Sequence, residues 1–149
     1  MKFSTRTLYG LKAVLVLAMR YGEGSLSVSH IAKKEGFSVH YLEQILNALK
    51  KKGIVKSVRG PQGGYALAQK PSELTLEGLF YSLEGRGGSP KEQVSSEMNE
   101  MTIANALFWQ KFERAIQSGF SDITLKDLVD EARSIKKTGF HAPVSTFHI

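Results

Sequence analysis

The sequence contains no cysteine among its 149 residues. Disulfide frameworks need paired cysteines, and structural zinc sites and iron–sulfur centres bind mainly through cysteine thiolates. The chain therefore offers neither a disulfide nor a thiolate-ligated metal centre. Histidine is also scarce, and its spacing matches neither H-x₃-H nor HExxH, so we predict no metal site. The four histidines are His30, His40, His141 and His148.

Long hydrophobic runs are missing as well. The longest apolar run is AVLVLAM at residues 13–19, whereas a helix that spans a bilayer needs about 20 apolar residues. Arg20 ends the run and no small-x-small cleavage motif follows, so a secretion signal is not predicted. We expect a cytoplasmic protein.

Motifs of catalysis are absent too. The glycine-rich stretch 60–64 lacks the GK[ST] ending of a phosphate-binding P-loop. No Ser/His/Asp set and no pair of carboxylates can be argued from spacing. We therefore expect a binding protein and not an enzyme.

Positive charge is what the sequence has in excess, and one half of the chain holds it. The net charge is +6 and the pI is about 9.6. Residues 1–70 contain twelve Lys and Arg residues and three acidic residues, a net charge of +9, whereas residues 71–149 carry −3. The first half is suited to attract a polyanion such as nucleic acid, and the second half is not.

Serine caps and apolar spacing predict three helices in the first third of the chain. In the third helix, Leu42, Ile45, Leu46 and Leu49 have the i, i+3, i+4, i+7 spacing of one buried face. The expected N-caps and helices are Ser4 with residues 5–21, Ser27 with residues 28–35, and Ser38 with residues 39–52.

The pattern changes from helical to alternating after Gly53. Residues 54–58 (IVKSV) and 64–68 (GYALA) predict two short strands, and the Gly63-Gly64 pair is a strong turn signal between them. Three helices followed by a β-hairpin is the order of a winged helix-turn-helix domain. The predicted fold class is mainly α with a small β-hairpin wing, extended by a long helix further along the chain.

The second half predicts helices at 75–85 and 97–119, and the longer one has an apolar face. Thr124 and Asp127 form a capping-box pattern before a short helix that ends near Ser134. The predicted divisions are a winged helix-turn-helix domain at 1–85, a flexible Gly/Ser/Pro-rich linker at 86–96, a long and a short helix at 97–136, and a disordered tail at 137–149.

The third helix has a second face opposite its leucines, on which every side chain is polar or can form hydrogen bonds. A helix of this size fits a major groove, where Gln and Asn pair with adenine edges and Glu accepts from cytosine. Any amphipathic helix has a polar face, so this face alone does not decide the function. Its residues are His40, Tyr41, Glu43, Gln44, Asn47 and Lys51.

The loop after the first strand combines one arginine with several glycines. A wing beside a reading helix reaches the neighbouring minor groove, where an arginine side chain gains from the negative potential. Arg59 is suited to this role, because Gly60, Gly63 and Gly64 allow the backbone to approach the duplex. The alternative is an ordinary surface turn with an incidental arginine. Further phosphate contacts are expected from Lys56 and Gln62.

Other cations of the first half can be interpreted either as ordinary surface residues or as DNA contacts. Lys50, Lys51 and Lys52 are suited either to a solvated helix end or to phosphate contacts. Lys2 and Arg6, at the start of the first helix, are predicted phosphate contacts on the same grounds.

Three segments of the chain are similar to a known family. They are MKFSTRTLYGLKAVLVLA, SHIAKKEGFSVHYLEQILNALKKKGIVKSVRGPQGGYALA and LTLEGLFYSLEG. Together they closely resemble the bacterial Rrf2 family of dimeric winged-helix transcription regulators. The resemblance covers residues 1–85 strongly and residues 97–134 more weakly, and the combination of YLEQ with RGPQGGY is highly specific.

The resemblance implies how such a protein would engage DNA. The helix that starts at Ser38 would enter the major groove, and Arg59 with the following glycines would enter the minor groove. The long helix would cross that of a second copy, so that a homodimer reads an imperfect palindrome. The expected dimer contacts are Met101, Ala104, Leu107, Phe108, Phe112 and Ile116.

One departure from the family pattern concerns its iron–sulfur cluster. Cluster-binding members carry three cysteines, often with a histidine, between the 75–85 helix and the long helix. This chain has GRGGSPKEQVSSEMNEMTIANAL there, so we expect no cluster and no other cofactor.

The end of the sequence resembles that of the cysteine-metabolism repressors of the family, which also lack the cluster. Those repressors sense the enzyme O-acetylserine sulfhydrylase, which accepts peptides with a C-terminal isoleucine. Phe147, His148 and Ile149 are the corresponding residues, and the alternative is a frayed terminus. The function predicted first is a homodimeric DNA-binding repressor, and the alternative is a protein-interaction module whose tail docks that enzyme.

Overall fold

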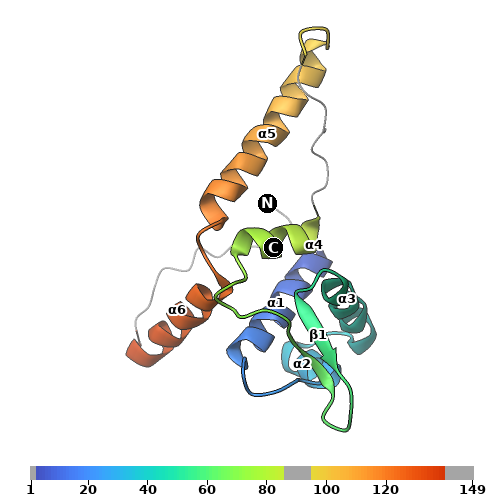
Figure 1. Ribbon diagram of the computed structural model, residues 1–149, viewed down its shortest axis with the longest axis vertical. Helices are drawn as coiled ribbons and strands as arrows, with labels where there is room; N and C mark the ends of the chain where they lie inside the picture. The colour runs from blue at the N-terminus through green and yellow to red at the C-terminus, as the bar shows by residue number, and fades with distance from the viewer. Residues whose placement is uncertain (1–2, 86–94, 140–149) are drawn as a thin grey trace.

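The computed structural model describes residues 3–85 and 95–139. Within them the chain forms six helices and one two-stranded antiparallel sheet, which confirms the mainly α class with a small hairpin. Figure 1 shows the first three helices and the hairpin gathered into one body, with α4 across its top and α5 rising away from it. The elements are α1 (Thr5–Met19), α2 (Val28–Glu35), α3 (Val39–Lys51), β1 (Val55–Val58), β2 (Gly64–Leu67), α4 (Leu76–Glu84), α5 (Glu100–Phe120) and α6 (Leu125–Thr138).

The first three helices begin at the serines that the sequence predicts. The hydroxyl oxygens of Ser4, Ser27 and Ser38 each accept a hydrogen bond from the backbone N–H three residues later, at 3.2, 3.1 and 3.4 Å. Such caps stabilise a helix by about 1 kcal/mol each. The first helix ends at Met19, earlier than expected, because the backbone leaves the helical conformation at Arg20.

The core of the winged-helix body lies between α1 and α3. Leu42, Ile45, Leu46 and Leu49 of α3 are buried, as their spacing predicts. Burying one such side chain stabilises the fold by about 1.5–3 kcal/mol. Because α3, α4 and α6 all pack against α1, the central helix is buried on more than one side. This packing holds the opposite face of α3 toward solvent.

The hairpin is held at both of its strands. β1 and β2 pair antiparallel, with Val55 opposite Leu67 and Val58 opposite Gly64. Leu26, in the connection between α1 and α2, exchanges two backbone hydrogen bonds with Tyr65 of β2, at 2.8 and 2.9 Å. The wing is therefore fastened to the helix-turn-helix by main-chain bonds.

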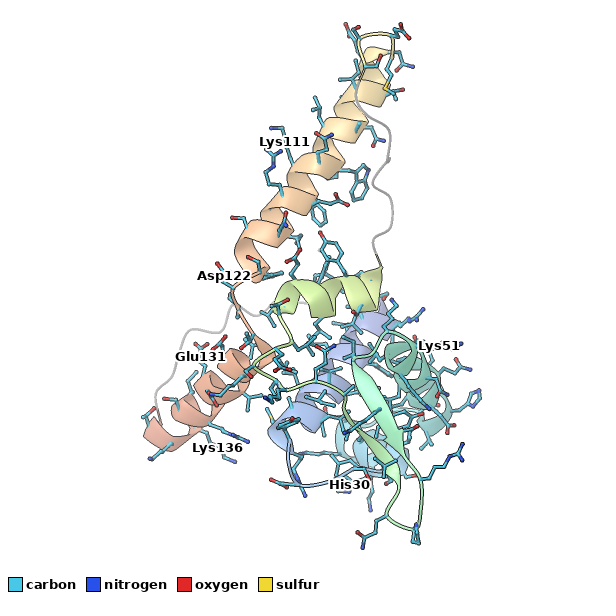
Figure 2. The ribbon with its side chains drawn as sticks, in the orientation of Figure 1. His30, Lys51, Lys111, Asp122, Glu131 and Lys136 are labelled. Carbon is cyan, nitrogen blue, oxygen red and sulfur yellow. The ribbon has the colours of Figure 1, made fainter. Side chains whose placement is uncertain are left out.

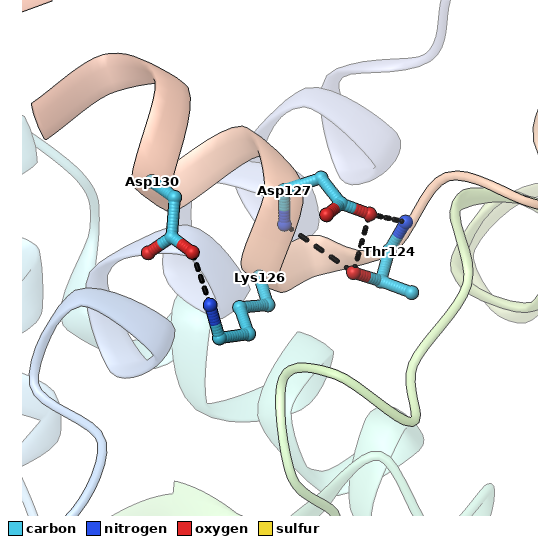
Figure 3. A network of polar contacts seen from close by, with 4 residues as sticks. All are labelled: Thr124, Lys126, Asp127 and Asp130. Carbon is cyan, nitrogen blue, oxygen red and sulfur yellow. Dashed lines mark hydrogen bonds and ion pairs between the residues drawn. The ribbon is translucent and has the colours of Figure 1, made fainter. Parts of the chain in front are cut away.

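The last helix packs back onto α1 through buried Leu125 and Val129, and the Leu125 N–H donates to the Leu74 carbonyl at 2.8 Å. Figure 3 shows the predicted capping box at its start. The Asp127 N–H donates to Thr124 Oγ1 at 3.3 Å, and the Thr124 N–H donates to Asp127 Oδ2 at 2.8 Å. The hydrogen bonds from Thr124 hold the pKa of the Asp127 carboxyl below its usual range.

The ends of α5 and α6 differ from expectation. Asn99 caps α5, so the helix begins at Glu100, and it continues through Gly119 to Phe120 because its hydrogen bonds do not require a side chain there. The last helix extends to Thr138, one turn beyond the predicted end. No helix in the described ranges is long and apolar enough to cross a membrane.

Candidate nucleic-acid interface

The polar face of α3 is open to solvent along its length. His40, Glu43, Gln44, Asn47 and Lys51 are exposed and recur every three or four residues, so they share one side of the helix. Figure 2 shows Lys51 projecting outward from the body, on the side away from α6. The Nε2 atoms of His40 and Gln44 are hydrogen-bonded at 3.0 Å. The face presents the donors and acceptors that pair with base edges in a major groove.

Tyr41 has a different environment from the rest of this face, because it is half-buried. Its ring meets Tyr9 of α1 edge-on, with 5.6 Å between the centroids, and Tyr9 stacks on Phe37 at 3.9 Å. The Lys12 ammonium lies 5.7 Å from the centre of the Phe37 ring. Tyr41 therefore packs α3 onto α1, and only part of its side chain is presented to solvent.

Ser38 and Asn47 also form hydrogen bonds within the chain. The Ser38 hydroxyl caps α3, and Asn47 Oδ1 accepts a hydrogen bond from the Tyr65 hydroxyl at 2.9 Å. A hydroxyl and an amide each have more than one donor or acceptor position. These bonds therefore leave both side chains able to contact a ligand.

The hairpin loop carries Arg59 into solvent at the end of β1. The Gly63 N–H donates to the Gly60 carbonyl at 2.9 Å, and Gly60 has a φ of +116°, a conformation that favours glycine. The Ser25 hydroxyl donates to the Gln62 carbonyl at 2.7 Å. The loop is therefore anchored to the α1–α2 connection while the arginine side chain is exposed.

Gly64 is needed for packing inside the protein. A Cβ atom there would lie 2.1 Å from the Leu26 carbonyl oxygen and 2.7 Å from the Ser27 nitrogen. The sequence interpretation assigned this glycine to an approach of DNA, whereas the structure shows an approach of the chain's own backbone. Contact between Gly64 and DNA stays a prediction.

Two of the three consecutive lysines at the end of α3 form hydrogen bonds within the chain. Lys50 Nζ donates to the Ser57 hydroxyl oxygen at 2.6 Å, and Lys52 Nζ donates to the Ser82 carbonyl at 2.5 Å. The middle lysine lies on the exposed face of α3 with the other polar residues. All three lysines are exposed, and so are the other described cations with predicted contacts, Arg6, Lys56 and Arg59.

Acidic residues reduce the positive surface of the body only locally. Glu23 forms an ion pair with Arg20, and Glu35 forms one with Lys12 at 3.8 Å. Glu43 is the acidic residue on the exposed face of α3. A carboxylate there repels phosphates and accepts hydrogen bonds from the amino group of cytosine, so it favours base contact over backbone contact.

Lys33 and Lys34 of α2 are exposed cations that the sequence interpretation did not include among the contacts. They immediately follow Ile31 and Ala32, which are buried. The helical spacing could have identified them, because two residues that follow a buried pair on a helix turn toward solvent. They add two exposed cations on the helix that precedes α3.

The long helix α5 exposes large apolar side chains. Met101 is 79% exposed, Phe108 58% and Leu107 40%. Phe108 stacks on Phe112, with 6.3 Å between the ring centroids. Of the other predicted dimer contacts, Ala104 is exposed, whereas Phe112 and Ile116 are half-buried.

Several predicted residues lie outside the described ranges. They include most of the 86–96 linker and nearly all of the 137–149 tail. The residues with predicted contacts among them are Lys2, Phe147, His148 and Ile149.

Three helices, a hairpin wing beside the third and an exposed polar face on that helix define a winged helix-turn-helix protein. The family model named Rrf2, described as an iron-dependent transcriptional regulator, matches residues 3–131. The chain belongs to the Rrf2 family of transcriptional regulators.

Individual relatives agree with this assignment. The HTH-type transcriptional regulator CymR of Bacillus subtilis (strain 168) is 38% identical over 128 residues, which cover 86% of this chain and 89% of the relative. The solved structure of CymR (YrzC), the global cysteine regulator of B. subtilis, has a TM-score of 0.69 at 36% identity and covers 88% of this chain and 98% of its own. The structure of T. potens IscR has a TM-score of 0.71 at 34% identity and covers 99% and 97%. CymR is a transcriptional regulator by name, which agrees with the expectation of a non-enzyme.

The family description mentions iron, and the residues of this chain do not fit a cysteine-ligated cluster. Cysteine is absent from every position of the sequence. Among the residues that the structure describes, no group of three His, Cys, Asp or Glu side chains is arranged to hold a metal ion. No step of a mechanism can therefore be assigned to a cluster here.

Proposed function

We propose that this chain is a homodimeric, sequence-specific DNA-binding transcriptional repressor. The observation that carries the proposal is the exposed polar face of α3 beside the exposed Arg59 wing, within the half of the chain that has a net charge of +9. Both features are held by the same small body, so they can engage one duplex together. As a repressor, the bound dimer would keep other proteins from both grooves of its site.

The reading of bases would be divided between the two features. The α3 face enters the major groove, where Gln44 and Glu43 meet base edges, and Lys51 contacts the backbone. The wing lies over the adjacent minor groove, and the Arg59 guanidinium enters it where A·T-rich sequence makes the groove narrow and negative. The exposed cations of α2 and β1 add phosphate contacts that do not depend on sequence.

A second copy of the chain would supply the second half-site. The exposed apolar residues of α5 favour this arrangement, because Met101, Leu107 and Phe108 are left uncovered among the described residues. Two wings related by a twofold axis would read an imperfect palindrome. We also propose that the dimer works without an iron–sulfur cluster, because the chain has no cysteine to ligate one.

Salt-dependent binding to a palindromic duplex tests the proposal. The logarithm of the affinity should fall steeply and linearly with the logarithm of salt concentration. Arg59→Ala should weaken binding by about 1–3 kcal/mol, with the largest loss on sites flanked by A·T pairs. Lys137→Ala is the matched control, because it removes one exposed cation from α6. Equal effects of the two substitutions would contradict the placement of the wing.

A second candidate function is a protein-interaction module whose C-terminal residues dock O-acetylserine sulfhydrylase. The observation that favours it is the similarity to CymR, which is described as a global cysteine regulator. Calorimetry with that enzyme and an Ile149→Ala variant tests it. This candidate predicts binding that the substitution weakens, together with DNA binding that is weak at every salt concentration.

A further inference from the structure

Tyr65 connects three separate elements of the winged-helix body. It lies on β2 opposite Ser57 of β1, and its backbone exchanges two hydrogen bonds with Leu26. Its hydroxyl donates to Asn47 Oδ1 on α3, at 2.9 Å. The side chain is therefore a direct link between the wing and the exposed face of α3.

The environment of this tyrosine keeps its hydroxyl a donor. Tyr65 is 8% exposed. Burial, and secondarily the nearby carboxylate of Glu43, raise the pKa of the Tyr65 hydroxyl. Both act against loss of the proton that the hydroxyl donates to Asn47.

The bond determines which end of the Asn47 amide is presented to a ligand. Oxygen and nitrogen are separate substituents on the planar amide carbon, so a bond that holds Oδ1 against Tyr65 leaves the Nδ2 amino group to point in a different direction. Tyr65 is buried, Asn47 is exposed, and the bond to Tyr65 uses Oδ1, which leaves Nδ2 available to a ligand. The exposed end of Asn47 consequently offers two N–H donors.

We infer that Tyr65 is a positioning residue that makes Asn47 a donor-only contact in the major groove. The inference rests on the proposed DNA-binding function. Asparagine pairs with adenine through both ends of its amide, whereas a donor-only amide selects the acceptors of guanine or thymine, or a phosphate. Asn47 is thereby removed from the adenine-reading role that the sequence alone predicts for it.

The neighbouring Gln44 lies close enough in α3 to be confused with Asn47 in a binding assay. It is hydrogen-bonded to His40 and not to the wing. A change that acts through the tyrosine hydroxyl should therefore alter the base preference at the Asn47 position and leave the Gln44 position unchanged.

The test selects binding sites from duplexes with about 30 randomised base pairs, which is enough for two half-sites one helical turn apart. The full-length protein is compared with Tyr65→Phe, Asn47→Ala and the double variant. Tyr65→Phe should lower affinity by about 2- to 10-fold, the effect of one hydrogen bond. It should also weaken the preference at the same symmetric base pair as Asn47→Ala, and the double variant should resemble Asn47→Ala.

A matched control and a measurement without DNA complete the design. Tyr21→Phe removes a hydroxyl from an exposed tyrosine just after α1 and should leave the selected sequence unchanged. In the free protein, the side-chain amide NMR signals of Asn47 should shift in Tyr65→Phe and not in Tyr21→Phe.

The results distinguish the positioning role of Tyr65 from the DNA-binding function of the protein. If the wild type selects a palindrome and Tyr65→Phe selects the same one with unchanged preference, the positioning role is overturned and the proposed function stands. If the wild type selects no sequence, the proposed function is overturned and the inference is overturned with it. A change in preference shared by Tyr65→Phe and Asn47→Ala, with both variants still folded at the temperature of the selection, supports the inference.

Discussion

The winged-helix body and the α5–α6 region bury their apolar residues in different ways. Apart from Ala106, Leu125 and Val129, every buried apolar residue in the described ranges belongs to the body, to α4 or to the segment that joins them. The α6 helix joins the body through two of these residues, and Arg133 donates to the Met19 carbonyl of α1 at 2.9 Å. The α5 helix instead exposes large apolar side chains and contacts mainly α4, which lies across the top of the body.

The body is therefore expected to determine the stability of the single chain, and α5 is expected to determine its assembly into a dimer. The body contains a core that holds α3 and the wing in place within one chain. The exposed side chains of α5 would be stabilised only when another surface covers them, at about 25 cal/mol for each Å² of apolar area removed from water. Substitutions in the body should therefore change the free energy of unfolding, whereas substitutions in α5 should change the oligomeric state.

The largest expected effect is on the core of the body. Leu46→Ala should lower the free energy of unfolding by about 2–5 kcal/mol, because it leaves a cavity at a fully buried position. Urea denaturation followed by circular dichroism measures it. Leu107→Ala is the comparison on α5, and its smaller loss should depend on protein concentration, because that residue would be covered only in the dimer. Equal, concentration-independent losses would show that α5 belongs to the same core.

The next effect concerns assembly through α5. Phe108→Glu should convert the dimer to a monomer, because it places a charge in the middle of the apolar face. Affinity for a full palindrome should fall by about 100-fold or more, since the two half-sites are no longer linked. Analytical ultracentrifugation and a binding assay measure these changes. Gln110→Glu adds the same charge at an exposed polar position of the helix, and a monomer from that variant too would argue against a specific interface.

The smallest effect concerns the start of α6. Thr124→Ala removes the cap and should lower the melting temperature by about 2–4 °C at pH 7. The folded pKa of Asp127 is lowered by its bonds to Thr124, so its contribution is present above about pH 4 and is lost as the pH falls through the lowered value. The difference between variant and wild type should therefore shrink at pH 3. Val129→Ala, in the buried face of α6, should keep its difference at both pH values.

Much of the local structure could be predicted because its causes are local. Serine caps at Ser4, Ser27 and Ser38 and the capping box at Thr124 depend on residues three positions apart, and all four are present. Helix ends were less predictable. The α5 helix passes through Gly119, because a glycine lowers helix stability without preventing its hydrogen bonds.

The sequence predicted which residues make up the candidate site, but it could not show which of their polar atoms are free to contact a ligand. Sequence spacing placed Gln44, Asn47 and Arg59 near the expected surfaces, but it could not show that Asn47 accepts a hydrogen bond from Tyr65. It also assigned Gly64 to a ligand, because the contact with Leu26 joins residues far apart in the chain.

Three features could be derived from the amino-acid sequence alone: the order of three helices and a hairpin, the concentration of positive charge in the first half and the absence of thiolate ligands. These properties follow from composition and from spacings within one or two helical turns. The folded structure was needed to show which polar groups are already hydrogen-bonded within the chain, which cations are exposed and which apolar face is left uncovered. Those properties depend on contacts between distant segments, which periodicity along the chain does not encode.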